Sequence, residues 1–201
     1  MTSAPPTRHN GDVIPGSALT KGRLLVATPP LDDPNFDRAV VYMLEHHAEG
    51  AIGVVINRPT DESLDEPLDR WEDLQAVPTS VFLGGPVEID ALIALAYAKQ
   101  PVTEAGDQLS PVSGHVASAD LTTDPALVAA LVNSVRVFRG YAGWGPGQLE
   151  GEIDAGAWLV LDAELQDVFG PSPDHLWRSV LRRQGGRLAW LAEVPDDLSA
   201  N

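Results

Sequence analysis

Two apolar runs set the centre of the fold: Ala39-Val40-Val41-Tyr42-Met43-Leu44 and Ala51-Ile52-Gly53-Val54-Val55-Ile56. Both are rich in β-branched and aromatic residues, and both have the length of a strand. The five residues from His46 to Gly50 that separate them suit a hairpin loop. We therefore predict an antiparallel pair. Because apolar residues occupy both faces of each strand, we expect other parts of the chain to cover the hairpin on both sides.

Shorter signals on either side of the hairpin predict further strands. Extended structure is expected at residues 22–27, 91–98, 135–138 and 158–161, and the run 91–98 is also short enough for a helix. The glycine-rich stretch 140–147 predicts a turn. Strands and helices follow one another irregularly, without the regular alternation of a doubly wound parallel sheet, so the pattern favours the α+β class.

Four helices are predicted from capping residues and apolar stripes. Pro67 suits the first turn of a short one, Asp124 caps the second, residues 148–155 form the third, and Ser172 caps the last. Glycines at 156 and at 185–186 end the third and the last. The inward-facing residues expected on these helices are Leu68, Trp71 and Leu74; Leu127, Val128, Leu131 and Val132; Leu149 and Ile153; and Leu176, Trp177, Val180 and Leu181.

Length and composition favour one domain, with two intimately joined lobes as the alternative, and a reducing compartment fits the composition. A chain of 201 residues that is 44% hydrophobic can bury one sizeable core. We expect residues 1–16 to be a disordered lead-in and residues 17–201 to form the single domain. There is no cysteine, which excludes disulfides, thiolate metal sites and a cysteine nucleophile. The start has no apolar run behind a basic cluster, so we expect no secretory signal and a cytoplasmic location.

The charge balance argues against polyanionic partners. With 29 acidic and 13 basic residues, the formal net charge is −16, which repels nucleic acid and anionic membrane surfaces. Residues 91–98, the longest apolar stretch, are far shorter than the roughly 20 residues of a membrane-spanning helix. Arg178, Arg182 and Arg183 of the last predicted helix suit its negative C-terminal end better than they suit DNA. We therefore predict no direct nucleic-acid partner and no membrane partner.

The catalytic motifs that are recognisable from spacing are missing. The chain has no Gly-x-Ser-x-Gly, no His-Glu-x-x-His and no phosphate-binding P-loop, and residues 143–147 lack the third glycine of a dinucleotide fold. Glu45, His46 and His47 look like metal ligands, but neighbouring strand residues point to opposite faces, so satisfied or solvent-facing histidines are favoured. We predict no catalytic residue, no metal and no cofactor.

Polar residues at strand ends and glycine turns are the candidates for a ligand site. Asp32, Asp33 and Asp37 crowd one loop, and Phe36 predicts that this loop folds back onto the core. Arg58 precedes a proline that fixes its backbone and can bind a carboxylate or a phosphate, although an internal acidic partner is favoured. The predicted ligand-binding residues are Asp33, Arg38, Asn57, Arg58, Gly85, Trp144 and Gln148.

Six segments stand out together by their order and spacing: residues 22–29, 33–42, 45–46, 50–60, 84–87 and 143–153. Taken together they resemble the signature segments of the bacterial AlgH-like (YqgE) proteins, over nearly the whole chain from about Ser17 to Asn201. The resemblance implies an α+β fold whose strongly curved mixed or antiparallel sheets form a barrel-like core flanked by helices. It also implies a cytosolic protein under the family label of transcriptional regulator, and it carries over no catalytic residues.

Three functions remain open from the sequence. We favour a non-enzymatic regulatory domain that binds an unidentified protein or small ligand and acts indirectly on gene expression, because no nucleophile–base pair or metal set is found. The alternative is an enzyme that uses carboxylates and Arg58 on a small anionic substrate. A direct DNA-binding regulator is what the family label implies and what the charge opposes.

Overall fold

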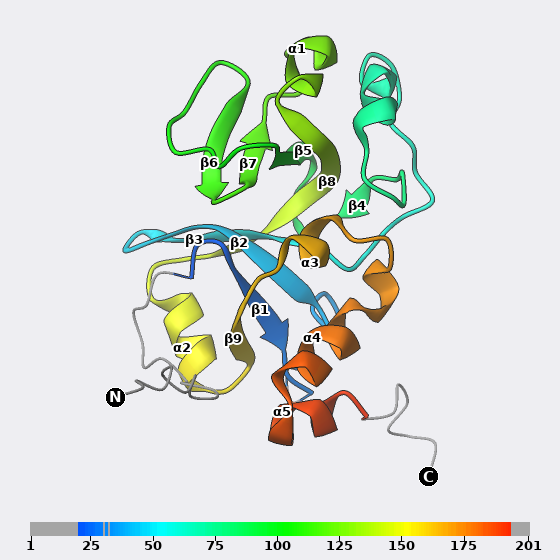
Figure 1. Ribbon diagram of the computed structural model, residues 1–201. Coiled ribbons are helices and arrows are strands. Elements are labelled where there is room, and N and C mark those ends of the chain that lie inside the picture. The colour runs from blue at the N-terminus through cyan, green and yellow to red at the C-terminus, as the bar shows by residue number, and fades with distance from the viewer. Residues whose placement is uncertain (1–19, 30, 32, 194–201) are drawn as a thin grey trace, which may run out of the picture.

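The computed structural model describes residues 20–29, 31 and 33–193. The expected lead-in, residues 1–16, lies outside the described residues, so the division into lead-in and domain stays a prediction. Nine strands form a curled, mostly antiparallel sheet in the order β6-β7-β5-β8-β3-β2-β1-β9, with β4 beside β8 (Figure 1). The sheet makes a half-barrel flanked by helices, which confirms the predicted α+β class.

The elements follow one another irregularly along the chain. The strands are β1 (Arg23–Ala27), β2 (Val40–His47), β3 (Gly50–Val55), β4 (Phe82–Leu83), β5 (Val87–Ala98), β6 (Leu109–Ser113), β7 (Val116–Ala119), β8 (Val132–Trp144) and β9 (Trp158–Asp162). The α-helices are α1 (Pro125–Ala129), α2 (Gln148–Asp154), α3 (Leu165–Phe169), α4 (Leu176–Gln184) and α5 (Gly186–Leu191), and the 3₁₀ helices are η1 (Asp69–Leu74) and η2 (Pro173–His175). None of the described helices is long and apolar enough to cross a membrane.

The predicted hairpin is β2 and β3, paired antiparallel with Tyr42 opposite Val54. Its loop is shorter than expected, because β2 continues to His47 and β3 already begins at Gly50, whose φ of +138° suits the sharp return. The expectation of cover on both faces holds at Val54, which is fully buried, but is wrong for Ile52, which is 39% exposed. Ile52 lies nearer the hairpin tip, beyond the core that α4 builds over Val54.

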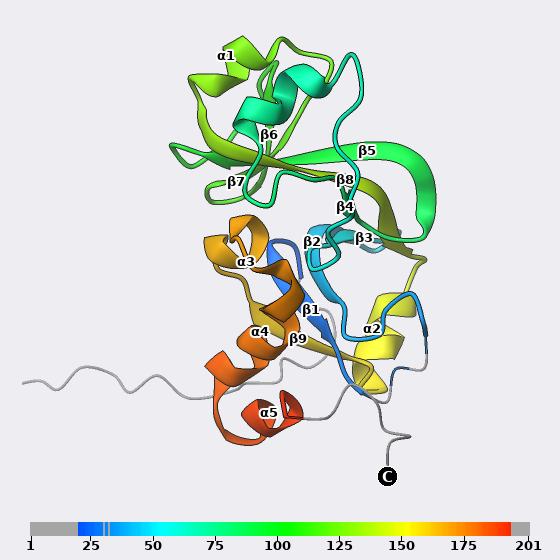
Figure 2. The same cartoon turned by 90° about the vertical axis from the view of Figure 1, so that its right-hand side faces the viewer.

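Strand β8 joins two lobes of the molecule. From Val132 to Arg139 it pairs with β5, and from Ala142 to Trp144 it pairs with β3. We call β4–β7 with η1 and α1 the β5 lobe, and β1–β3 and β9 with α2–α5 the hairpin lobe; Figures 1 and 2 show one above the other. The turn predicted at 140–147 is wrong over most of its length, because the glycines let the strand bend. At Gly140, where φ is +66°, a Cβ would lie 2.5 Å from the Gly85 carbonyl oxygen.

Three apolar clusters fill the two lobes. One cluster packs Val54 and Tyr42 against α4 and continues into the β5 lobe through Phe82 and Leu95. Another, in the hairpin lobe, packs Val41 on the opposite face against Trp144 and Trp158. The third cluster fills the β5 lobe around Trp71. The hairpin therefore has a core on each face, as its two-sided apolar pattern predicts.

The helices differ in detail from the sequence expectations. Asp124 caps α1 by accepting from the Ala126 amide at 2.9 Å, but α1 is only five residues long, Leu127 and Leu131 are exposed, and Val132 already belongs to β8. The Ser172 side chain makes no cap, because η2 precedes α4. The expected stripe of α4, Leu176, Trp177, Val180 and Leu181, is buried. Residues 148–154 form α2, with Leu149 fully buried.

Candidate functional site

The loop from Asp33 to Arg38 folds back onto the core, as Phe36 predicts. The Phe36 ring stacks on Trp144 with centroids 6.3 Å apart and meets the edge of Trp158 at 5.4 Å. The Asp33 carboxylate accepts from the Asn35 amide at 2.8 Å, which closes a tight turn before the aromatic anchor. The loop therefore has a fixed path that places its polar residues beside the end of β3.

Asn57 ties this loop to the hairpin. Its Oδ1 accepts from the Val40 amide at 2.8 Å, and its Nδ2 donates to the Arg38 carbonyl at 2.9 Å. The Arg38 guanidinium lies 5.3 Å from the centre of the Trp177 ring, a cation–π contact with α4. Both residues thus have structural partners, and we assign them to supporting the site rather than to contacting a ligand.

Arg58 is the cation of the candidate site. Its Nη2 donates to the Asp37 carbonyl at 3.2 Å, and no carboxylate of the described residues forms an ion pair with it. The expected internal acidic partner is therefore replaced by a backbone oxygen. Burial lowers the pKa of Arg58, and the nearby charges of Asp37 and Asp33 oppose that shift. The guanidinium stays cationic at neutral pH because arginine begins from a very high pKa.

A hollow of about 240 Å³ opens beside Arg58. Asn35, Arg58 and Gly85 give it polar and backbone groups, while Leu83 and Ile89 give it apolar walls. Gly85 has a φ of +153°, and a Cβ there would lie 2.3 Å from the Tyr141 carbonyl, so only glycine lets the chain pass this close to β8. We call this cavity the Arg58 hollow.

Trp144 and Gln148 belong to a different network. Glu152 accepts from Trp144 Nε1 and Trp158 Nε1, each at 2.8 Å, and from Gln148 Nε2 at 2.9 Å. Gln148 Oε1 in turn accepts from the Gly145 amide at 3.1 Å. The Phe36 ring contacts Trp144 from the Asp33–Arg38 loop, but Trp144 and Gln148 are not among the residues that line the Arg58 hollow.

The structure therefore divides the seven predicted residues. Arg58 and Gly85 line one hollow, and Asp33 acts on Arg58 through its charge. Arg38 and Asn57 support the loop without being part of the hollow's lining, and Trp144 and Gln148 belong to the Glu152 network. The sequence missed Asn35, Leu83 and Ile89 as lining residues. Asn35 shares the predicted loop and had a signal there, whereas nothing local marks two apolar residues of β4 and β5 as neighbours of Arg58.

His46 and His47 have structural partners, in line with the expectation of satisfied or solvent-facing histidines. His46 is buried; its Nδ1 lies 3.0 Å from the Thr20 hydroxyl and its Nε2 lies 3.2 Å from a Glu150 oxygen. The pKa of the Glu150 carboxyl is lowered, chiefly by a hydrogen bond from the backbone amide of Glu150 itself. Desolvation opposes this shift, and the hydrogen bond from the His46 side chain adds to it. His47 contacts Glu45 at 3.0 Å on the surface. Across the described residues, no group of three or more His, Asp or Glu side chains could hold a metal ion.

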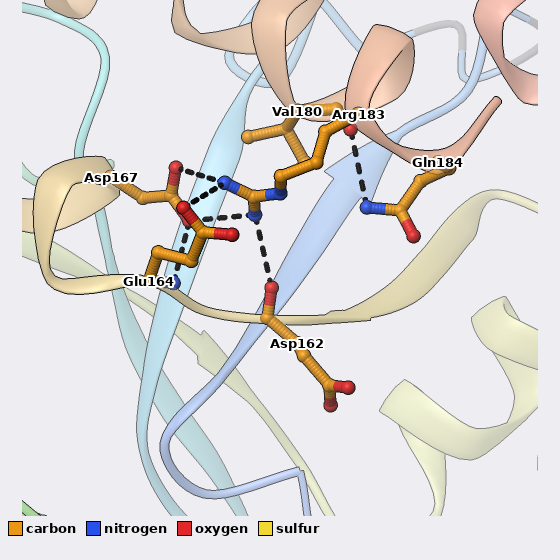
Figure 3. Close-up of polar contacts among 6 residues, drawn as sticks. All are labelled: Asp162, Glu164, Asp167, Val180, Arg183 and Gln184. Atoms are coloured by element: carbon orange, nitrogen blue, oxygen red, sulfur yellow. Dashed lines mark hydrogen bonds and ion pairs between the residues drawn. The ribbon is translucent and has the colours of Figure 1, made fainter. Parts of the chain in front are cut away.

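Arg182 and Arg183 of α4 pair with acids of their own chain, and Arg178 donates to the Ala192 carbonyl. Arg183 donates to both oxygens of Asp167, at 2.9 and 2.8 Å, and lies 3.2 Å from Glu164 (Figure 3). These contacts raise the pKa of Arg183, chiefly through the Asp167 hydrogen bond. Arg182 pairs with Glu193 at 2.9 Å. The three arginines of α4 are therefore engaged inside the molecule.

One buried cation has no counterpart in the sequence predictions. Arg136 of β8 is 2% exposed and lies between the lobes, donating to the Val77 carbonyl at 2.7 Å and to the Gly170 carbonyl at 3.2 Å. Its Cζ stands 4.3 Å from the centre of the Phe82 ring. Burial lowers the pKa of Arg136 to about 10, so the group stays charged at neutral pH. It joins β8 to a loop of each lobe.

The curled half-barrel flanked by helices, with a hollow at a strand end that Gly85 helps to line, defines a protein of the α+β class. Residues 24–189 match the AlgH-like family, and the chain belongs to that family. A UPF0301 protein of Streptomyces avermitilis is 51% identical over 187 residues, which cover 92% of this chain and 96% of the relative.

Two solved structures share the fold. The crystal structure of a protein from Corynebacterium diphtheriae matches with a TM-score of 0.80 at 28% identity, over 92% of this chain and 94% of that one. The solution structure of the AlgH protein from Pseudomonas aeruginosa matches with a TM-score of 0.63 at 29% identity, over 98% and 100%. The predicted resemblance is thereby confirmed.

Proposed function

We propose that the protein is a non-enzymatic, cytoplasmic binding domain that holds a small carboxylate- or phosphate-bearing ligand in the Arg58 hollow and acts on gene expression indirectly. The observation that carries this is the state of Arg58. Its guanidinium is half-buried, bonds to one backbone oxygen and forms no ion pair with any described carboxylate. A planar guanidinium with unused N–H donors at the wall of the hollow can donate two parallel hydrogen bonds to a carboxylate or a phosphate.

The surroundings of Arg58 limit the ligand to a small one. Asp33 and Asp37 stand close enough to act on the guanidinium by charge, and the chain carries a formal charge of −16. A polyanion would meet this field over its whole length, whereas a single anionic group would meet Arg58 first. Leu83 and Ile89 offer apolar contact to the rest of such a ligand.

The same carboxylates support a second candidate, an enzyme that acts on a small anionic substrate bound by Arg58. Asp37 is exposed beside the hollow and would be the general base, whereas Asp33 is occupied in its turn. We rank this second because no hydroxyl or imidazole nucleophile lines the hollow among the residues described. A direct DNA-binding role ranks third, because Arg182 and Arg183 are paired with acids.

The test is a titration of the ¹⁵N-labelled protein with inorganic phosphate and with succinate at constant ionic strength. We expect saturable shifts of the backbone amides of Asn35, Arg58 and Gly85. The Arg58→Gln variant should bind at least tenfold more weakly, because the charge-assisted pair is lost. Arg70→Gln is the matched control, since Arg70 is an exposed arginine in η1 of the other lobe, and it should leave the affinity unchanged.

Two results would count against the proposal. Linear shifts that never saturate would mean that neither oxyanion is bound at a site. Equal weakening by Arg58→Gln and Arg70→Gln would mean that the anions respond to net charge alone. Consumption of an added phosphate monoester at the same site, lost in Asp37→Asn, would favour the enzyme instead.

A further inference from the structure

A second hollow, of about 150 Å³, lies at the seam between the lobes and is separate from the Arg58 hollow. Tyr42 and Gly22 line it from the hairpin lobe, and Ser113 and His115 line it from the β5 lobe. Helix α3 contributes Leu165 and Val168, and Figures 1 and 2 both show α3 directly beneath the β5 lobe. We call it the seam pocket. A cavity of this size accommodates a molecule about as large as benzene.

The Tyr42 phenol offers a hydrogen-bond donor to the seam pocket. Tyr42 is 1% exposed, and burial raises the pKa of its hydroxyl, so the proton stays on the oxygen. Its Oη has no hydrogen-bond partner in the described part of the chain. A Cβ placed on Gly22 would lie 3.8 Å from this oxygen and 2.5 Å from Ser113 Oγ, which puts the phenol end at the pocket wall. The hydroxyl oxygen is not fully enclosed, so its proton can be donated to water or to a ligand in the seam pocket.

His115 supplies the complementary group. Its Nδ1 lies 2.9 Å from the Ala98 carbonyl. Because a carbonyl can only accept, Nδ1 carries the proton of the neutral ring and Nε2 remains an acceptor. The ring packs edge-on against Tyr97 at 6.2 Å, and Tyr97 stacks on Phe169 of α3 at 5.7 Å. The imidazole is therefore held in place by β5, and Tyr97 links it to α3 of the other lobe.

The remaining walls select against charged ligands. Glu164 lines the seam pocket, and its carboxylate already pairs with Arg183 at 3.2 Å. The Glu164 carboxylate would repel an anionic ligand, and its ion pair with Arg183 leaves it less available to a cationic one. No lysine or arginine is among the lining residues. Val116, Leu165 and Val168 are apolar and need a ligand with a small hydrocarbon part.

We propose that the seam pocket binds a small uncharged carboxamide. The amide oxygen accepts from the Tyr42 hydroxyl, the amide N–H donates to His115 Nε2, and the hydrocarbon part packs against Val116, Leu165 and Val168. Because the pocket is built from both lobes, binding also stabilises their contact. The proposal does not depend on the Arg58 hollow.

The test uses isobutyramide as probe, with isobutyrate as a charged analogue of the same shape. In ¹⁵N-labelled protein, isobutyramide should give saturable shifts of the amides of Tyr42, Ser113 and Val168, and isobutyrate should bind at least tenfold more weakly. Tyr42→Phe should weaken isobutyramide binding about five- to tenfold, the effect of losing one hydrogen bond. Its melting temperature without the probe should be close to that of the wild type, because no residue of the described chain forms a hydrogen bond with the hydroxyl that is removed.

Control variants keep the outcome decisive. Tyr141→Phe removes a phenol outside the pocket, and Arg58→Gln alters the other hollow; both should bind isobutyramide like the wild type. Unchanged affinity in Tyr42→Phe, or equal binding of isobutyrate, would overturn the proposal. So would a lower melting temperature of Tyr42→Phe, because the hydroxyl would then stabilise the fold itself. An absence of saturable shifts would mean that the pocket holds water only, which also overturns it.

Discussion

Arg183 and Arg136 both bind the region of α3, but Arg183 binds a carboxylate and Arg136 binds a backbone carbonyl. Arg183 reaches Asp167 inside the helix, and Arg136 reaches the Gly170 carbonyl just after it. The Arg183 side chain is 29% exposed and meets carboxylates, whereas Arg136 is 2% exposed and meets carbonyls and the Phe82 ring. The charge of Arg183 is neutralised near the surface, whereas the charge of Arg136 is stabilised in the interior by carbonyl groups and an aromatic ring without a carboxylate.

The difference shows that burial and pairing have different consequences for stability. A partly exposed ion pair contributes at most about 1 kcal/mol and weakens with salt. A buried cation contributes little net stability, but its removal leaves acceptors without donors at about 1–3 kcal/mol each. Arg136 therefore fixes how β8 meets the two lobes, and Arg183 only strengthens a contact that α3 and α4 already make.

The largest loss of stability should come from a buried charge that has neither an ion-pair partner nor hydrogen-bond partners. Val54→Asp places a carboxylate at a fully buried position surrounded by apolar side chains. An unpaired buried charge is disfavoured by several kcal/mol, a large part of the ~5–15 kcal/mol that holds a domain together. We expect an unfolded or aggregated variant, seen as loss of the thermal transition in circular dichroism.

Ile52→Asp is the matched control in the same strand. Ile52 is 39% exposed, so water can solvate the new carboxylate, and we expect a folded protein within about 1 kcal/mol of the wild type. A folded Val54→Asp variant with an unchanged melting temperature would show that the hairpin is not the structural centre.

The next largest effect is expected at Arg136. Arg136→Ala leaves the carbonyls of Val77 and Gly170 without their donor and opens a cavity, so urea unfolding should show a loss of about 3 kcal/mol. Arg136→Met fills the same space without a charge and should lose clearly less. Equal losses in the two variants would assign the effect to the carbonyls, and a loss below 0.5 kcal/mol in both would break the comparison.

The smallest effect is expected at Arg183. Arg183→Gln removes the bidentate pair with Asp167, and we expect a loss of about 1 kcal/mol at low salt. Because this pair is partly exposed, the difference from the wild type should shrink as sodium chloride is raised. The loss in Arg136→Ala should be insensitive to salt. A salt-independent loss at Arg183 would mean that it acts by packing rather than by charge.

The parts of the fold that the sequence predicts are those fixed by nearby residues. The hairpin follows from two apolar runs with a short spacer, and the Asp124 cap and the α4 stripe follow from local pattern. The same reasoning is wrong at residues 140–147, because glycine favours a turn in isolation and here permits a bent strand against Gly85. Pairing partners far along the chain override the local preference.

The candidate site at Arg58 and the seam pocket were only partly predictable for the same reason. Arg58 and Gly85 are recognisable because a proline and a glycine pair mark them. Tyr42 and His115 are not, because Tyr42 is indistinguishable from a core strand residue, and His115 meets it only through the folding of β6 and β7 over α3. Arg136 sits in an apolar run and gives no sign of burial until the two loops that bond to it are in place.

The pairing of β1 with β9 sets a constraint on how the protein is made. Leu24 pairs with Leu161, so the first described strand finds its outer neighbour only after most of the chain has left the ribosome. Until then β1 has an open edge that can pair with other chains, and contacts this distant in sequence form slowly. Nascent chains cut short before residue 158 should thus be clients of chaperones, although the hairpin itself is complete long before.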